Sequence, residues 1–265
     1  MNELIKILKM TEKELKEYVY DYLVNKKMNP VKQDGFVYAK GEIPVLLVAH
    51  LDTVFKRPPE IILYDNEHDI MTASGGLGGD DRCGVFAILK ILKEMKPYVL
   101  FTEKEEVGGI GAKKVVDKLK KPNVKYMIEF DRQGENDCVF YDCGNFEFIE
   151  YIESFKFETE LGIFSDISIL GPAWDIAAVN ISSGYYNEHT YNEYIKVREL
   201  LTNIERVKEI LKESKKVKYF DYQEKVFQVN FENSNISNIN TPEYDLLWEI
   251  FNYPVKGKSR ILKNK

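Results

Sequence analysis

Short apolar runs alternate along the chain with longer segments in which apolar residues recur every three or four positions. The short runs predict strands at residues 35–39, 44–49, 98–101, 124–130 and 176–181. The longer segments predict helices at residues 2–9, 11–26, 82–95, 110–120 and 193–214. A short unbroken apolar run is typical of a buried strand, whereas the wider spacing marks one face of a helix. Strands that alternate with helices predict βαβ units and a mostly parallel sheet.

Four segments depart from this alternation. Residues 61–71 predict a β-hairpin, and residues 138–141 predict a short strand. Residues 146–156 fit a helix or a strand equally well, and residues 165–170 fit a loop or a short helix.

The last fifty or so residues of the chain are more polar than the rest. This change in composition suggests a boundary between two parts of the chain. We expect a single domain over residues 1–215 and a C-terminal extension over residues 216–265. Within the extension, Thr241-Pro242-Glu243 has the form of a helix start, because proline is well tolerated at the first helical position.

Composition and charge narrow the class of protein. The chain has 265 residues and a formal net charge of −6. That charge disfavours a nucleic-acid-binding surface and favours a local site for cations. No stretch approaches the roughly 20 apolar residues of a membrane span, and the N-terminus lacks the apolar core of a signal peptide. We therefore expect a cytoplasmic protein that binds neither nucleic acid nor membrane.

The three cysteines do not predict a site. Cys83, Cys138 and Cys143 are odd in number and lack CxxC spacing, which argues against a disulfide framework and against a thiolate zinc site. Cys138 and Cys143 could pair across a hairpin, but reduced cysteines are the rule in the cytoplasm.

Histidines and carboxylates gather next to glycines or at the ends of predicted strands. They are His50 with Asp52, Asp80 with Asp81, Glu105 with Glu106, Asp131, and His189. Because ligands bind at the carboxyl ends of the strands in an open parallel sheet, we expect these side chains to share one edge. Imidazole and carboxylate together suit zinc, cobalt or manganese. Two divalent cations would also remove the repulsion within such a carboxylate cluster.

Each of these residues also has an ordinary structural explanation. A histidine after a strand is commonly solvated, and Asp80-Asp81 before a helix fits an N-cap. Asp131 could pair with Arg132, and His68 fits a hairpin turn without a functional role. The metal site is favoured because the features occur together, in register with the strand ends.

Four motifs occur in chain order within about residues 44–200. They are Ala49-His50-Leu51-Asp52-Thr53-Val54, Gly79-Asp80-Asp81-Arg82-Cys83-Gly84, the stretch from Thr102 to Ala112 that contains Glu105-Glu106-Val107-Gly108-Gly109, and the late His189. Together they resemble the signature set of the di-zinc metallopeptidases of the M20/M28 clan. The resemblance implies a three-layer αβα sandwich with a mixed, mainly parallel sheet. It also implies hydrolysis of a peptide or a peptide-like amide, with an aminopeptidase as our first choice.

The resemblance implies a role for each motif residue. It assigns the metal-ligating positions as follows: His50 and Asp131 on the first zinc, Glu106 and His189 on the second, and Asp80 bridging the two. Glu105 is then the general base. Asp52 hydrogen-bonds the far nitrogen of the His50 ring and fixes its tautomer. Paired metal ions of this kind lower the pKa of water and polarise a scissile carbonyl.

The chain departs from the clan's larger members in one respect. Only residues 132–188 separate Asp131 from His189, which is too short for the lid domain that many M20 enzymes insert there. We therefore expect a catalytic domain without a lid, and look for an oxyanion partner among Tyr185, Tyr186 and Tyr191, which flank the histidine.

Other functions remain as alternatives. An amidohydrolase or deacylase of the same clan stays open, as does a non-catalytic metal-binding protein that retains the fold, although Glu105 argues against the latter. A metallophosphoesterase needs further histidine motifs that three histidines cannot supply. A phosphate-binding loop fails because no Gly-Lys-Ser/Thr follows the glycines.

Overall fold

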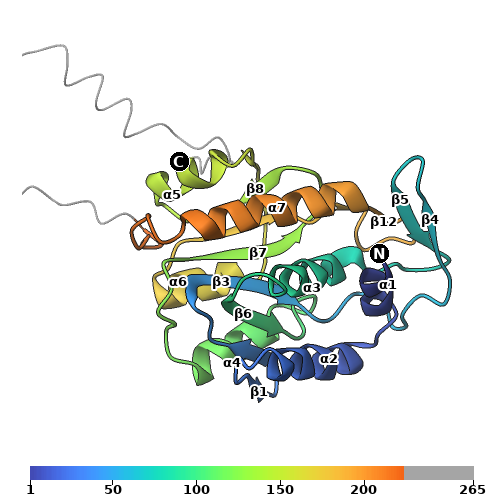
Figure 1. Cartoon of the computed structure of the whole chain (residues 1–265), viewed down its shortest axis with the longest axis horizontal. Helices are drawn as coiled ribbons and strands as arrows, with labels where there is room; N and C mark the ends of the chain where they lie inside the picture. The colour runs from blue at the N-terminus through green and yellow to red at the C-terminus, as the bar shows by residue number, and fades with distance from the viewer. Residues whose placement is uncertain (224–265) are drawn as a thin grey trace, which may run out of the picture. The chain divides into compact units, whose positions relative to one another are not determined.

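A computed structural model describes residues 1–223 of the chain (Figure 1). All of these residues belong to one compact unit. The helix start expected at Thr241-Pro242-Glu243 lies outside the described residues. The domain division expected at residue 215 remains a prediction, and Phe220 and Tyr222, just beyond it, are buried.

A helix overlaps each segment predicted to be helical, although the last helix begins later than predicted. The helices are α1 (Asn2–Leu8), α2 (Glu12–Asn25), α3 (Gly79–Ile91), α4 (Ile110–Lys118), α5 (Phe146–Glu153), α6 (Ile167–Trp174) and α7 (Val197–Glu213). The segment at 146–156 is thus a helix, and its first turn is capped by Asn145, whose side chain accepts a hydrogen bond from the Phe148 N–H. The segment at 165–170 contributes to helix α6.

A mixed eight-stranded sheet forms the centre of the unit, in the order β1-β2-β6-β3-β7-β10-β8-β9. Its strands are β1 (Val31–Gln33), β2 (Phe36–Ala39), β3 (Ile43–His50), β6 (Pro97–Thr102), β7 (Tyr126–Arg132), β8 (Asp137–Val139), β9 (Glu158–Thr159) and β10 (Ala178–Ser182). The four central strands β6, β3, β7 and β10 are parallel, whereas β2 and β8 join them antiparallel.

Helices cover both faces of this sheet, which confirms the three-layer α/β fold. Alternate residues of a strand point to opposite faces. In β3, Val45 and Leu47 pack with residues of α1, α2, α3, α5 and α7, whereas Leu46 and Val48 pack with α4 and α6. Both faces of the central strands are therefore buried, which explains why these strands are continuous apolar runs.

A small antiparallel sheet stands apart from the main one and corrects one prediction. It contains β4 (Ile62–Asp65), β5 (Ile70–Ala73), β11 (Tyr185–Tyr186) and β12 (Tyr194–Lys196) in the order β11-β12-β5-β4. The hairpin predicted at 61–71 is present as β4 and β5. The helix predicted from residue 193 instead begins at Val197, because Tyr194–Lys196 pairs with β5.

The parallel register brings the ends of three strands together. His50 at the end of β3 lies opposite Thr102 at the end of β6, and β7 pairs with β3 on its other side. The Leu51 N–H donates to the Thr102 carbonyl at 2.8 Å, which holds the two strand ends in line. No helix among residues 1–223 is long and apolar enough to cross a membrane.

Candidate metal centre

His50 is the innermost residue of the cluster at the strand ends. Its side chain is almost wholly buried, and Nε2 lies 3.0 Å from Asp80 Oδ1 and 3.3 Å from Asp131 Oδ1. Nδ1 faces Asp52 Oδ1 at 3.4 Å, slightly beyond a well-formed hydrogen bond. The ring therefore faces the Asp52 carboxylate through Nδ1 and two carboxylates, those of Asp80 and Asp131, through Nε2.

A second histidine lies on the other side of Asp80. His189 Nε2 is 3.0 Å from Asp80 Oδ2 and 2.9 Å from Glu106 Oε2. His189 belongs to the loop between β11 and β12 and has a positive φ of 64°. The two oxygens of Asp80 therefore face two different imidazoles.

The arrangement of donors fits divalent cations. A neutral imidazole nitrogen carries at most one proton, so His50 Nε2 can donate to only one of the two carboxylates that it faces. The same holds for His189, which faces Asp80 and Glu106. Imidazole and carboxylate converging in this way are the ligands that zinc, cobalt and manganese prefer. The residues present thus fit a site for divalent cations.

Asp81 is also close to this cluster but is held differently. Its ligand atoms lie within 4.8 Å of those of His50 and Asp131. However, Asp81 Oδ2 accepts a hydrogen bond from the His50 N–H, and Oδ1 accepts one from the Gly84 N–H at 2.8 Å. Because both oxygens bind backbone amides, Asp81 anchors the start of α3 against β3.

The close approach of carboxylates alters their protonation. Burial, with the nearby Asp80 carboxylate, raises the pKa of Asp131 to about 7. Although burial opposes the effect, hydrogen bonds from His189 and His50 hold the pKa of Asp80 well below its usual range. Burial also raises the pKa of Glu105 to about 9. Without cations, Asp131 and Glu105 therefore keep their protons at pH values where exposed carboxyl groups are ionised.

Asp52 connects the imidazole to the glutamate pair. Its carboxylate accepts hydrogen bonds from the backbone N–H groups of Glu105 at 3.1 Å and Glu106 at 3.3 Å. Asp52 therefore holds the turn after β6 against the His50 ring, in addition to facing Nδ1.

The seven residues predicted from the sequence lie around one cleft or support it. Asp80, Glu105, Glu106, Asp131 and His189 line a cleft of about 500 Å³, together with Arg132 and Tyr185. His50 and Asp52 lie behind it. Of the three tyrosines, Tyr185 donates to Asp131 Oδ1 at 3.3 Å, whereas Tyr186 donates to Glu199 and the Tyr191 ring packs near Phe55.

Sequence reasoning missed two residues that position the cluster. Glu193 is buried and accepts hydrogen bonds from the N–H groups of Gly78 at 2.6 Å and Asp80 at 3.0 Å. Asn180 on β10 makes two hydrogen bonds to the backbone of Asp131, accepting from its N–H and donating to its carbonyl. Neither residue lies in one of the sequence motifs, so their burial and their hydrogen bonds in the structure are what identify them.

The structure also settles the residues that were given ordinary roles. His68 is exposed in the β4–β5 turn and pairs with Asp65. Cys83, Cys138 and Cys143 are buried and free.

Comparison with known proteins identifies the family. Residues 13–152 match the model described as Peptidase family M28. Because the match spans more than half of the chain, the chain belongs to peptidase family M28. It is a metal-dependent peptidase. Comparison with curated proteins finds no match.

Solved structures of similar fold include two bacterial peptidases and one archaeal one. Aminopeptidase PepT from Bacillus cereus superposes with a TM-score of 0.65 at 15% identity, covering 81% of this chain and 97% of that one. A tripeptidase from Staphylococcus aureus has a TM-score of 0.65 at 13% identity, with 82% and 98% covered. An aminopeptidase from the archaeon Desulfurococcus kamchatkensis has a TM-score of 0.59 at 17% identity, with 80% and 94% covered. At these identities the likeness establishes the fold.

Proposed function

We propose that the protein is a zinc-dependent aminopeptidase with a two-metal centre. The ligands are His50, Asp80, Glu106, Asp131 and His189. The observation that carries this proposal is the position of Asp80, whose two oxygens each lie 3.0 Å from the Nε2 of a different histidine. When bound there, two zinc ions supply Lewis-acid activation of water and of the scissile carbonyl.

Glu105 is the general base in this proposal. It lies in the same cleft as Asp80 and Asp131, and its backbone is fixed by Asp52. As a carboxylate, Glu105 takes a proton from the attacking water and then gives it to the nitrogen of the leaving amine. The same proton is therefore removed from the water and delivered to the leaving amine, so Glu105 ends the reaction as a carboxylate again.

Asp52 acts through His50. A carboxylate beside Nδ1 favours the tautomer that leaves Nε2 free to coordinate, and makes that nitrogen more basic. The 3.4 Å separation of Asp52 Oδ1 and His50 Nδ1 fits this orienting role, and the two backbone hydrogen bonds hold Asp52 in place.

The acidic walls of the cleft favour a substrate with a free amino end. Glu105, Glu106 and Glu188 all line the cleft beside His189. A protonated α-amino group gains from several carboxylates, whereas the carboxylate end of a peptide is repelled by them. Aminopeptidases among the proteins of similar fold support the same choice.

In this proposal the catalytic domain covers residues 1–215 without a lid domain, and residues 216–265 form an extension of unassigned role. In support, the polypeptide between Asp131 and His189 includes β8, α5, β9, α6 and β10.

Substrate pairs that differ at the amino end test the activity. We expect the purified protein to carry two zinc ions per chain and to hydrolyse leucine p-nitroanilide, while N-acetyl-leucine p-nitroanilide stays intact. A chelator should abolish hydrolysis, and added zinc should restore it. Release of acetate from the acetylated substrate, with leucine p-nitroanilide as the other product, would instead indicate a deacylase. Absence of bound metal would rule out the metal-dependent mechanism.

A further inference from the structure

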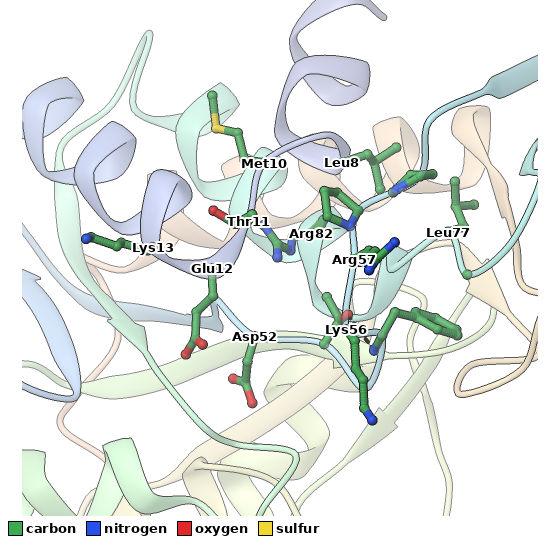
Figure 2. A pocket seen from close by; sticks show the side chains of 15 residues that line it. Leu8, Met10, Thr11, Glu12, Lys13, Asp52, Lys56, Arg57, Leu77 and Arg82 are labelled. Carbon is green, nitrogen blue, oxygen red and sulfur yellow. Dashed lines mark hydrogen bonds between the residues drawn. The ribbon is translucent and has the colours of Figure 1, made fainter.

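A second cavity lies next to Asp52 and shares no lining residue with the catalytic cleft. It measures about 370 Å³. Its walls come from the start of α2 at residues 10–13, from the loop at residues 52–59, and from Gly76, Leu77 and Arg82 (Figure 2). Neither the metal ligands nor the general base faces this cavity.

Arg82 is the most buried cation of the cavity. Its side chain is only 5% exposed, and its Nε and Nη1 atoms are buried with no hydrogen-bond partner among the described residues. The guanidinium of arginine keeps its charge at neutral pH. Asp52, Glu12 and Asp81 stabilise this charge through space, but the Nε and Nη1 groups still lack a hydrogen-bond acceptor in the described part of the chain. A buried donor without an acceptor is costly, which makes an acceptor in the cavity favourable.

The N-terminus of α2 faces the same space. The helix has 14 residues and starts at Glu12, and its Thr11 cap accepts a hydrogen bond only from the Glu14 N–H. The first N–H groups of a helix, here those of Glu12 and Lys13, have no partner within it. Together with the helix dipole, they form a favourable site for an anion.

Other charges around the cavity add up to a net positive field. Lys13, Lys56 and Arg57 line it and are exposed. Two carboxylates, Glu12 and Asp52, line it as well. In Figure 2 both point away from the Arg82 guanidinium, and no ion pair joins Arg82 to either of them within the described part of the chain. The guanidinium is therefore free to bind an acceptor from outside the chain.

We propose that this cavity is a binding site for a small oxyanion, either phosphate or a carboxylate, held by the Arg82 guanidinium and the N-terminus of α2. The planar fork of arginine matches the paired oxygens of both groups. Lys56 and Arg57 at the rim attract the anion, and Glu12 opposes it. This site stands on its own geometry and does not depend on the proposed peptidase specificity.

Titration of the metal-loaded protein with sodium phosphate at constant ionic strength tests the site. We expect a saturable site by calorimetry that persists when the metal is removed with a chelator, which distinguishes it from phosphate bound at the metal centre. Arg82→Met should weaken binding at least tenfold, and Arg57→Gln should weaken it two- to fivefold. Glu12→Gln removes an opposing charge, so it should tighten binding. Lys215→Gln removes an exposed charge far along the chain that does not line the cavity, and it should leave binding unchanged.

The rim variants keep the test decisive even if Arg82→Met does not fold. Arg57 and Glu12 are not core residues, and their substitutions must change affinity in opposite directions. Absence of saturable binding, or equal affinity in both rim variants, overturns the proposal. So does a crystal grown with phosphate that has only an ordered water on Arg82.

Competition separates the two sources of the oxyanion. N-acetyl-glycyl-glycine carries a free carboxylate, and its C-terminal amide does not. Displacement of phosphate by the acid and not by the amide would assign the site to peptide carboxylates as well. Displacement by neither, with phosphate bound, would assign it to free inorganic anions.

Discussion

The Glu193 carboxylate binds the backbone of Asp80, the residue that faces both histidines. Glu193 Oε1 accepts from the Asp80 N–H at 3.0 Å, and Oε2 accepts from the Gly78 N–H at 2.6 Å. Through this pair, the loop before β12 fixes the glycine-rich loop at the start of α3. Asp80 is thus positioned by a residue outside the proposed ligand set.

Removal of this support should loosen the metal centre. Glu193→Ala leaves two buried N–H groups without an acceptor, which costs about 1–3 kcal/mol of unfolding free energy. We expect metal affinity to fall about 10- to 100-fold, as for other residues that orient ligands. Competition with a chromogenic chelator measures this. Glu205→Ala, which removes an exposed carboxylate of α7, should leave metal affinity as in the wild type.

Loss of the proposed base should separate catalysis from metal binding. Glu105→Gln keeps the shape of the side chain but cannot accept a proton, so kcat should fall about 10²- to 10⁴-fold. Metal content by elemental analysis should stay at the wild-type value. Glu103→Gln serves as the matched control, because Glu103 pairs with Lys16 and does not line the cleft. Wild-type turnover in Glu105→Gln would show that another group moves the proton.

Metal removal should make stability depend on pH. The pKa of Asp131 is raised to about 7 and that of Asp166 to about 6, in both cases by burial first. A carboxyl with a raised pKa binds more protons in the folded state, so stability falls as pH rises from about 4 to the folded pKa. His50, whose pKa is raised by contact with carboxylates despite its burial, acts in the same direction above pH 6.5.

The Tm of the metal-free protein should therefore fall between pH 5.5 and pH 7.5. The Tm of the metal-loaded protein should fall less over this pH interval, because bound cations take the place of the protons on the clustered carboxyl groups. Differential scanning calorimetry with and without chelator measures the difference. A metal-free Tm that rises with pH over this range would contradict the assigned pKa directions.

The apolar rim of the cleft should influence which peptides are cleaved. Leu161 and Ile163 line the cleft and are 91% and 101% exposed. A substrate side chain that covers them would gain the free energy of burying apolar surface. Replacing both by serine should lower kcat/KM several-fold for leucine p-nitroanilide and less for alanine p-nitroanilide, with Tm unchanged. Phe146→Ser removes an exposed apolar residue outside the cleft and should alter neither value.

The sequence predicted what depends on short-range patterns. Apolar runs identified the central strands, and the strand ends placed His50 and Asp131 at one edge. Glu193 escaped prediction because its partners, Gly78 and Asp80, are more than a hundred residues away in the chain. The short strand Tyr194–Lys196 was hidden for a related reason, since its pairing with β5 overrides a local helical pattern.

The proposed metal ligands are spread from His50 to His189, and strands β6 to β10 of the main sheet lie between them. A growing polypeptide that ends before residue 189 can present His50, Asp80 and Asp131 but has no second imidazole for the centre. β10, which carries Asn180 to support Asp131, also emerges after β7. With His189 as a ligand, as proposed, the metal centre is incomplete until residue 189 has been synthesised.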